Sequence, residues 1–189
     1  MSALLEKKAA FTVGLLLDAA CELLKDTDIH ELSFKKVAEK ADISQRTMFR
    51  YFRTREAFLD ALTERLHSEL DLPNIPDKVE ALPAYIAHLY EKLDAQPRKV
   101  MVLLSSDLLP RVLSTTAKRR FEALEALLQQ FYPDANQRDI KKTAANLRYV
   151  MSASSWRYYR MHFEFDAQLA TECAQMLVNQ ALDYLRSPQ

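Results

Sequence analysis

Apolar residues recur at helical spacing along the whole chain. In the first segment, Phe11, Leu15, Ala19 and Leu23 follow one another at intervals of four residues, with Leu16, Ala20 and Leu24 beside them. This pattern predicts an amphipathic helix over about residues 6–25. Prolines and a Phe165–Asp166 step divide the second half into further segments of the same kind. There the expected helices are 77–94, 97–107, 110–131, 137–164 and 167–186.

Three shorter helices are expected between residues 33 and 70. Ser33 is a predicted N-cap for a helix that ends near Lys40, and Ser44 for one that ends near Tyr51. The intervening turn contains Asp42, a residue type that tolerates the left-handed conformation such turns often need. Thr54 is expected to cap the next helix. The residues expected to face the core are Val37, Ala38, Met48, Phe52, one ring of Phe49 or Tyr51, and Phe58, Leu59, Leu62 and Leu66.

Neither strand-length alternation nor an internal repeat interrupts the helical pattern. The sequence therefore predicts an all-α protein of about nine helices, in which a helix-turn-helix domain is followed by a helical bundle. The proline-containing stretch Leu72-Pro-Asn-Ile-Pro marks the expected boundary, giving domains 1–72 and 73–189.

The last two predicted helices, 137–164 and 167–186, carry more apolar surface than one fold requires. Tyr149, Trp156 and Phe163 are seven residues apart and would share a stripe, and the small residues 152–155 would let another helix approach closely. These features predict that the two helices form a homodimer interface.

Positive charge is concentrated in residues 33–55. The chain as a whole has 26 basic and 26 acidic residues and a formal net charge of zero. Within this segment, however, there are seven basic residues and only two acidic residues, Glu39 and Asp42, which leaves a net charge of +5 (7 − 2). Such a local excess of positive charge, on a helix-turn-helix pattern, indicates that the segment binds the DNA backbone.

Several other classes of function lack the residues they require. Gly14 is the only glycine, so no glycine-rich phosphate loop or dinucleotide fingerprint is present. The four histidines form no metal-ligand spacing, and no nucleophile elbow or Ser/His/Asp order occurs. We therefore expect no cofactor, no metal and no enzymatic activity.

Cysteine usage and the N-terminal residues favour a cytoplasmic protein. Cys21 and Cys173 each lie in an apolar helical stretch and are expected to be small buried hydrophobes rather than a disulfide. Lys7 and Lys8 precede an apolar run that mimics a signal peptide, but acidic residues follow it directly and the helical repeat continues. No apolar stretch approaches the ~18 residues that a membrane helix needs.

The stretch LLLDAACELLKDTDIHELSFKKVAEKADISQRTMFRYFRTREAFLDALTER resembles the N-terminal domain of TetR-type transcriptional regulators over about residues 11–66. The shared features are the amphipathic first helix, the start at Ser33, the turn before Ser44, the residues 47–52 and the start of the fourth helix at Arg55. Three departures stand out: Asp42 and Asp28-Ile29-His30 where glycine is usual, and Phe49 where many members have tyrosine.

The resemblance implies a dimeric DNA-binding regulator, most often a repressor that a small molecule releases from a pseudo-palindromic operator. Gln45, Arg46 and Thr47 match positions that contact bases or nearby phosphates, and Tyr51 and Arg55 match phosphate-contacting positions. The N-terminal residues of such a helix meet base edges, and the basic residues around it favour phosphates. The candidate DNA-binding residues are Ser33, Lys35, Lys36, Ser44, Gln45, Arg46, Thr47, Arg50, Tyr51, Arg53 and Arg55.

The resemblance also implies an effector cavity among the C-terminal helices. Aromatic and apolar residues at helical spacing there are candidates to line it, although such a stripe more often belongs to a core or a dimer seam. The candidates are Tyr85, Met101, Leu104, Leu108, Tyr149, Trp156 and Tyr158. An alternative function stays open: a helical ligand-binding or adaptor protein whose helix-turn-helix does not read DNA, which Phe49 slightly favours and the local charge of +5 opposes.

Overall fold

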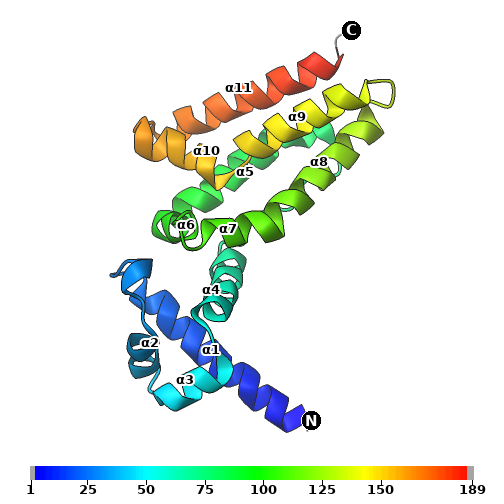
Figure 1. Cartoon of the computed structure of the whole chain (residues 1–189). Coiled ribbons are helices and arrows are strands. Elements are labelled where there is room, and N and C mark those ends of the chain that lie inside the picture. Colours follow the sequence, from blue (N-terminus) through cyan, green and yellow to red (C-terminus); the bar gives the residue numbers. More distant parts are fainter. Residues whose placement is uncertain (1–2, 187–189) are drawn as a thin grey trace. The chain divides into compact units, whose positions relative to one another are not determined.

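The computed structural model describes residues 3–186, and within this range the chain is helical and contains no strand (Figure 1). The expected all-α class is confirmed. Eleven α-helices occur among the described residues, slightly more than the nine expected. None of the helices in this range is both long and apolar enough to cross a bilayer.

The chain divides into two compact units, which are described separately. The first comprises residues 1–69 together with 101–111, and the second comprises 70–100 and 112–189. The segment 101–111 thus packs with the N-terminal helices, from which it is far removed in sequence. That residues 1–72 and 73–189 are separate domains stays a prediction.

The first unit contains α1 (Ala3–Leu23), the 3-10 turn η1 (Ile29–Glu31), α2 (Phe34–Lys40), α3 (Gln45–Tyr51) and α4 (Arg55–Glu69). Its α1 packs against α2 and α4, and α2 packs against α3. All three expected caps are present. The hydroxyls of Ser33, Ser44 and Thr54 accept hydrogen bonds from the backbone N–H three residues later, at 3.2, 3.2 and 3.1 Å.

The buried stripe of α1 differs from the expected one. Leu16, Ala20 and Leu24 are buried, whereas Phe11 is 69% and Leu15 38% exposed. The expectation that Phe11 and Leu15 lead the buried face was therefore wrong. The helical period identified two adjacent rows of apolar residues. Ala19 of the first row is also buried, so the packing leaves exposed only the N-terminal part of that row.

The turn between α2 and α3 is a Schellman motif with Asp42 in the left-handed region, at φ 54°. Ile43 N–H donates to the Ala38 carbonyl at 2.9 Å, and Asp42 N–H donates to the Glu39 carbonyl at 3.2 Å. These two bonds satisfy carbonyls that the end of α2 leaves free. The turn therefore fixes where α3 begins relative to α2.

We expect Asp42→Gly to stabilise the helix-turn-helix, because glycine adopts a positive φ without the strain that an L-residue pays. The gain should be small, about 0.5–1 kcal/mol, since glycine also loses more backbone freedom on folding. Urea denaturation followed by circular dichroism measures it. Asp42→Val is the matched control and should destabilise, because a β-branched residue strongly disfavours this conformation. Equal stability of the two variants would contradict the assignment.

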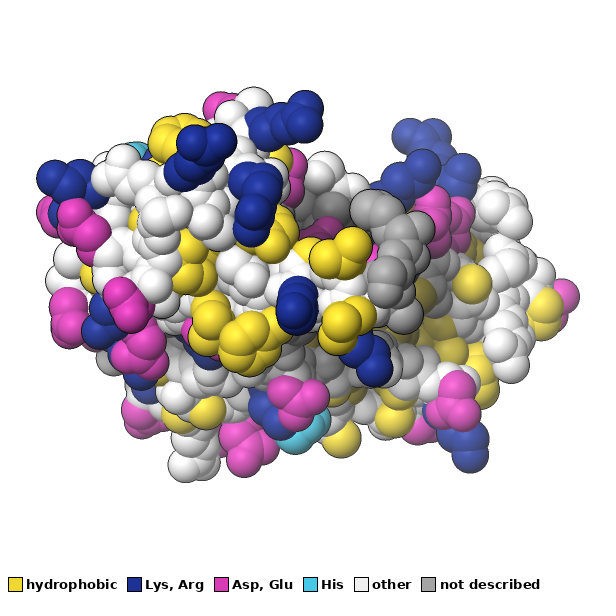
Figure 2. Space-filling view, turned by 90° about the horizontal axis from the view of Figure 1, so that it is seen from below, with side chains coloured by type: hydrophobic (Ala, Val, Ile, Leu, Met, Phe, Trp, Pro, Cys, Tyr) yellow, Lys and Arg dark blue, Asp and Glu magenta, His cyan; other side chains and the backbone are white. Residues whose placement is uncertain are grey.

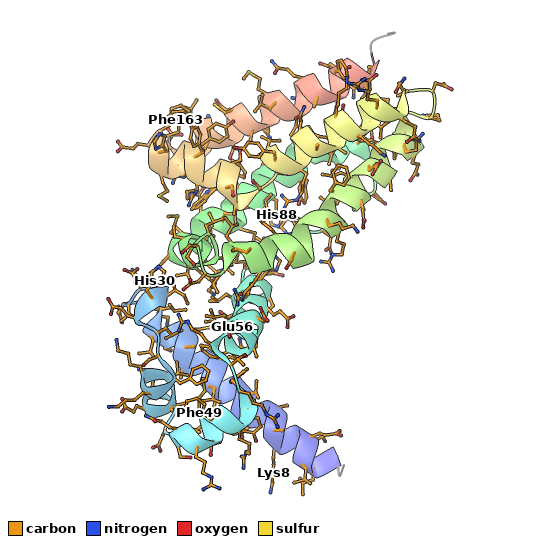
Figure 3. All side chains as sticks on the ribbon, viewed as in Figure 1. Lys8, His30, Phe49, Glu56, His88 and Phe163 are labelled. Atoms are coloured by element: carbon orange, nitrogen blue, oxygen red, sulfur yellow. The ribbon has the colours of Figure 1, made fainter. Side chains whose placement is uncertain are left out.

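Aromatic rings fill the space beneath α2, α3 and α4. Phe58 is fully buried, and its ring centroid lies 5.5 Å from that of Phe34 and 5.2 Å from that of Phe52. Of the two rings left open by the sequence, Tyr51 is half-buried and Phe49 is 53% exposed, although Phe49 still contacts Phe34 at 5.2 Å. Figure 3 shows Phe49 on the surface of α3.

The second unit contains the 3-10 turn η2 (Val79–Ala81) and a series of packed helices. Its α9 (Gln137–Val150) packs against α8 (Lys118–Phe131) and α11 (Ala167–Arg186), and α11 also packs against α5 (Leu82–Ala95). Along the chain, α6 (Pro97–Leu103), α7 (Leu109–Val112) and a π-helical turn, η3 (Leu113–Ala117), come between α5 and α8, and residues 101–111 of this stretch belong to the first unit. The expected helix 110–131 is therefore formed by three consecutive helical pieces, α7, η3 and α8.

The expected single helix over 137–164 was wrong. The chain breaks at Met151 and Ser152, and a short helix α10 (Ala153–Arg157) and a π-helical turn η4 (Tyr158–His162) follow α9. Ser152 caps α10 by accepting from Ser155 N–H at 3.2 Å, so it ends one helix and starts another. Tyr149 and Phe163 are therefore exposed, whereas Trp156 is fully buried, and the three do not share a stripe.

The two cysteines are also less buried than expected. Cys21 on α1 and Cys173 on α11 are both half-buried, and they do not form a disulfide with each other. The helical stretches that carry them were correctly identified, but each cysteine lies at the edge of the buried face. They do not contribute the small core residues that the sequence predicted.

Candidate nucleic-acid interface

The N-terminal end of α3 presents free polar side chains. Ser44 uses its hydroxyl to cap the helix and lies 2.9 Å from the hydroxyl of Thr47. Gln45 and Arg46 are exposed, and neither forms a hydrogen bond or ion pair with any residue of the described range 3–186. Their side chains are therefore available to an external partner.

The C-terminal end of α3 carries an arginine held against a tyrosine ring. The Arg50 guanidinium lies 5.0 Å from the centroid of the Tyr51 ring, and its Nη2 donates to the Tyr51 hydroxyl at 3.3 Å. The ring of Tyr51 is half-buried, so it orients both groups. Arg53, just beyond the helix, is exposed and has no partner among the described residues.

The start of α2 adds two lysines with weak intramolecular partners. Lys35 lies 3.9 Å from Glu39 and Lys36 lies 3.7 Å from Glu31, and all four side chains are about half exposed or more. Exposed pairs of this kind contribute at most about 1 kcal/mol and are screened by salt. A phosphate group would therefore displace these carboxylates at little cost.

Arg55 has a role that the sequence did not predict. Its Nη1 donates to the Leu32 carbonyl at 2.7 Å, its Nη2 donates to the Ile29 carbonyl at 3.2 Å, and Nη2 lies 3.6 Å from Asp107. Arg55 thus joins the start of α4 to the loop before α2. Its contact with DNA phosphate stays a prediction, and two of its five N–H donors already bind backbone carbonyls.

We expect Arg55→Ala to lower the free energy of unfolding of the first unit by about 1–3 kcal/mol. The substitution leaves the Leu32 carbonyl without its donor and removes one of two donors to the Ile29 carbonyl, which also accepts from Leu32 N–H at 3.2 Å. Urea denaturation followed by circular dichroism, with hydrogen exchange of the 29–32 amides, measures the loss. Arg53→Ala is the matched control, since Arg53 is exposed and makes no contact within the described chain. Equal stabilities for the two variants would show that the Arg55 hydrogen bonds do not support the fold.

The view of the molecule from below shows Lys and Arg side chains projecting from a surface that also carries apolar side chains (Figure 2). In Figure 3, Lys8 lies on the first turns of α1 and Phe49 on α3. Ten of the eleven candidate residues lie on α2, α3, the start of α4 or the N-caps of α2 and α3, and Arg53 lies in the short loop between α3 and α4. Their contacts with DNA stay predictions.

The seven effector candidates are distributed over both units. Met101, Leu104 and Leu108 belong to the first unit, and Tyr85, Tyr149, Trp156 and Tyr158 to the second. Their environments also differ. Trp156 is fully buried and its indole N–H donates to Asp94 at 3.1 Å, whereas Tyr158 is 49% exposed with its ring 5.1 Å from that of His162.

Only Tyr149 of the seven lines the groove that runs between α9 and α11. This surface groove has a volume of about 570 Å³ and is also lined by Lys142, Leu147, Leu177 and Tyr184. Tyr85, in contrast, is buried in α5 and accepts a hydrogen bond from Arg120 at 2.9 Å. A role of the seven residues in binding an effector stays a prediction.

Sequence reasoning missed three polar residues that the structure brings into partly buried contacts. Asp107 meets Arg55, and Arg120 and Arg148 extend toward the interior of the second unit from α8 and α9. One signal was present for the arginines: each lies four residues from a fully buried apolar residue on its own helix, Leu124 or Ala144. Nothing in the sequence indicated Asp107.

The exposed α3 on a capped turn defines this protein as a helix-turn-helix protein of the all-α class. Residues 16–62 match the family of bacterial regulatory proteins described as the tetR family. The chain carries a TetR-family N-terminal domain, so the resemblance noted in the sequence is confirmed.

Known relatives and structures agree with this assignment. The class D tetracycline repressor protein of Escherichia coli is 38% identical over 61 residues, which is 31% of this chain and 28% of that protein. The chain thus spans under a third of the length of the curated relatives it matches.

Two solved structures from Rhodococcus sp. RHA1 share the fold over most of their length. One is a transcriptional regulator with a TM-score of 0.64 and 17% sequence identity. The alignment with it covers 93% of this chain and 96% of the regulator. The other is a TetR-like transcriptional regulator with a TM-score of 0.60 and 18% sequence identity, and the alignment covers 91% of this chain and 96% of that regulator. At this level of identity the likeness establishes a TetR-like fold.

Proposed function

We propose that the protein is a sequence-specific DNA-binding transcriptional regulator, most simply a cytoplasmic repressor that acts as a homodimer. The observation that carries this proposal is the exposed N-terminal end of α3, where Gln45 and Arg46 have no partner among residues 3–186, within a segment that matches the tetR family. Arg to guanine and Gln to adenine are the natural pairings for such a helix in the major groove.

The surrounding cations supply affinity rather than sequence preference. Lys35, Lys36, Arg50 and Arg53 are exposed around the same surface. Each phosphate contact releases counterions, so the logarithm of the binding constant should fall linearly as the logarithm of salt concentration rises. A dimer doubles the number of contacts and predicts half-sites about 34–36 Å apart or slightly more.

Selection from a random duplex library tests the proposal directly. The purified protein should enrich a pseudo-palindromic sequence, and a gel shift with that sequence should give a steep salt dependence. No enrichment, together with equally weak binding to every duplex, would favour the adaptor function instead. The DNA upstream of the protein's own gene provides an independent duplex for the same gel shift.

The dimer interface is proposed to lie on α9 and α11. On α11, Leu169, Met176, Leu177 and Tyr184 are 39–54% exposed and lie on one side of the helix. The opposite buried side carries Ala170, Ala174, Val178 and Leu182, which pack within the unit. An apolar second face on an already packed helix supports association with a second copy.

We expect Leu177→Glu to dissociate the dimer, because a charge on this apolar face would be buried without a partner in the assembly. Asn179→Glu is the matched control, since Asn179 is exposed on the polar side of the same helix. Sedimentation velocity at micromolar concentration distinguishes the two. If Leu177→Glu sediments as the wild type does, this face is not the interface.

A further inference from the structure

Two arginines and a tyrosine meet in the interior of the second unit. Arg120 of α8 donates from Nη1 to the Tyr85 hydroxyl at 2.9 Å and from Nη2 to the Pro73 carbonyl at 3.1 Å. Arg148 of α9 has a buried Nε with no hydrogen-bond partner, and its Nη1 reaches the Met151 carbonyl only at 3.5 Å. Tyr85 interacts electrostatically with both guanidinium groups.

This cluster has positive charge and no carboxylate to neutralise it. Neither Arg120 nor Arg148 forms an ion pair with an acidic side chain anywhere in residues 3–186. Burial, and then the nearby Arg120 cation, lower the pKa of Arg148 below its ordinary value. Two half-buried cations close together destabilise a fold unless a negatively charged group binds between them.

The remaining hydrogen-bond donors suit an oxyanion. Arg148 retains Nε and Nη2, and the Tyr85 hydroxyl accepts from Arg120 and so keeps its own proton to donate. Burial raises the pKa of Tyr85, so the hydroxyl is protonated at neutral pH. A guanidinium fork and a phenol together match the geometry of a carboxylate or phosphate.

Apolar residues adjoin the cluster on all three helices. Leu89 lies one turn after Tyr85, Leu124 one turn after Arg120, and Ala144 one turn before Arg148, and all three are buried. A molecule bound to the arginines would therefore meet hydrocarbon beyond its charged group. This arrangement favours an organic anion over an inorganic one.

We propose that Tyr85, Arg120 and Arg148 form the anion-recognition part of an effector site, which takes a small organic molecule bearing a carboxylate. This inference rests on the proposed regulatory function only in calling the bound molecule an effector. Binding of the anion supplies the negative charge that the cluster lacks and stabilises the second unit by mass action.

Thermal unfolding in the presence of defined anions tests the site. The probes are sodium hexanoate, sodium benzoate and sodium phosphate, each compared with sodium chloride at equal ionic strength and pH, with hexanamide and benzamide as uncharged counterparts. Hexanoate or benzoate should raise the Tm of the wild type above its value in chloride, and the amides should not. A rise with phosphate alone would overturn the organic carboxylate.

Arg148→Met is the decisive variant, because methionine keeps much of the apolar stem and removes the charge. It should melt at or above the wild-type temperature in chloride and should bind hexanoate or benzoate about tenfold or more weakly. Arg138→Met, an exposed arginine on the same helix, is the control and should respond as the wild type does. An equal carboxylate response in Arg148→Met, or none in the wild type, would overturn the site.

The DNA-binding proposal is assessed separately from this site. Gel shifts with the selected duplex should weaken when the stabilising carboxylate is added, and Arg148→Met should lose that sensitivity. Stabilisation by carboxylate in a protein that binds no DNA would support the anion site and contradict the regulatory function. Specific DNA binding without any carboxylate response would support the regulatory function and overturn the anion site.

Discussion

Replacing Arg46 with alanine is expected to abolish most of the preference for one base pair in each half-site. The side chain is exposed at the second position of α3 and has no partner within the described chain, so its removal disturbs no internal contact. A bidentate arginine–guanine pair contributes about 1–3 kcal/mol of discrimination, and a dimer uses two copies, which gives about 2–6 kcal/mol in total. Binding to random DNA should change much less.

Competition gel shifts with the selected operator and a random duplex of equal length measure this effect. Arg53→Ala is the control, because Arg53 is also exposed and unpartnered but lies beyond the end of α3. It should weaken binding to both duplexes alike and reduce the salt slope by about one for each phosphate that is no longer neutralised. Matching profiles for the two variants would show that Arg46 reads no base.

Local features of the first unit were predictable because their causes are only a few residues apart. The hydroxyls of Ser33, Ser44 and Thr54 cap helices by accepting hydrogen bonds from the backbone N–H three residues later. The positive φ of Asp42 likewise follows from a turn of three residues. Such bonds depend on neighbouring sequence and little else. The helix-turn-helix and its exposed charges therefore follow from the sequence.

The faces of long helices were harder to predict because they depend on distant partners. Phe11 and Leu15 have the same spacing as Leu16 and Ala20, and only the packing of α2 and α4 decides which stripe is buried. In the 137–164 segment the helical period continued through a real break. Ser152 was interpreted as a small interface residue, although serine is also a preferred N-cap.

Polar contacts across long stretches of sequence escaped prediction altogether. Arg55 meets Asp107 and Arg120 meets Tyr85, over 52 and 35 positions respectively. A charged residue on an amphipathic helix is normally solvated, so an inward-facing arginine leaves only a faint signal in its apolar neighbours. For the same reason the aromatic effector candidates could be chosen only by spacing, and their role stays a prediction.

Phe58→Ala is expected to give the largest loss of stability in the first unit, about 3–5 kcal/mol. The Phe58 side chain is fully buried, and its ring packs edge-on against both Phe34 of α2 and Phe52 at the end of α3. Its removal leaves a cavity shared by three helices. Because domains are stable by only about 5–15 kcal/mol, this is a substantial fraction of the total.

Urea denaturation, with hydrogen exchange of the α2, α3 and α4 amides, locates the loss in the first unit. Phe49→Ala is the matched control: its ring also contacts Phe34, at 5.2 Å, but is 53% exposed. It should cost only about 1 kcal/mol. Comparable losses from the two substitutions would mean that the ring cluster does not form the core beneath α3.

Comparing Phe58→Ala with Arg46→Ala distinguishes the folding that holds α3 in place from the reading of bases by α3. Phe58→Ala should lose affinity for every duplex in parallel with unfolding as temperature rises, because the cluster holds α3 against α2 and α4. Arg46→Ala should instead keep wild-type stability and lose only preference among duplexes, since the side chain is exposed. Binding isotherms at several temperatures distinguish the two losses, and a selective loss of preference in Phe58→Ala would contradict a purely structural role.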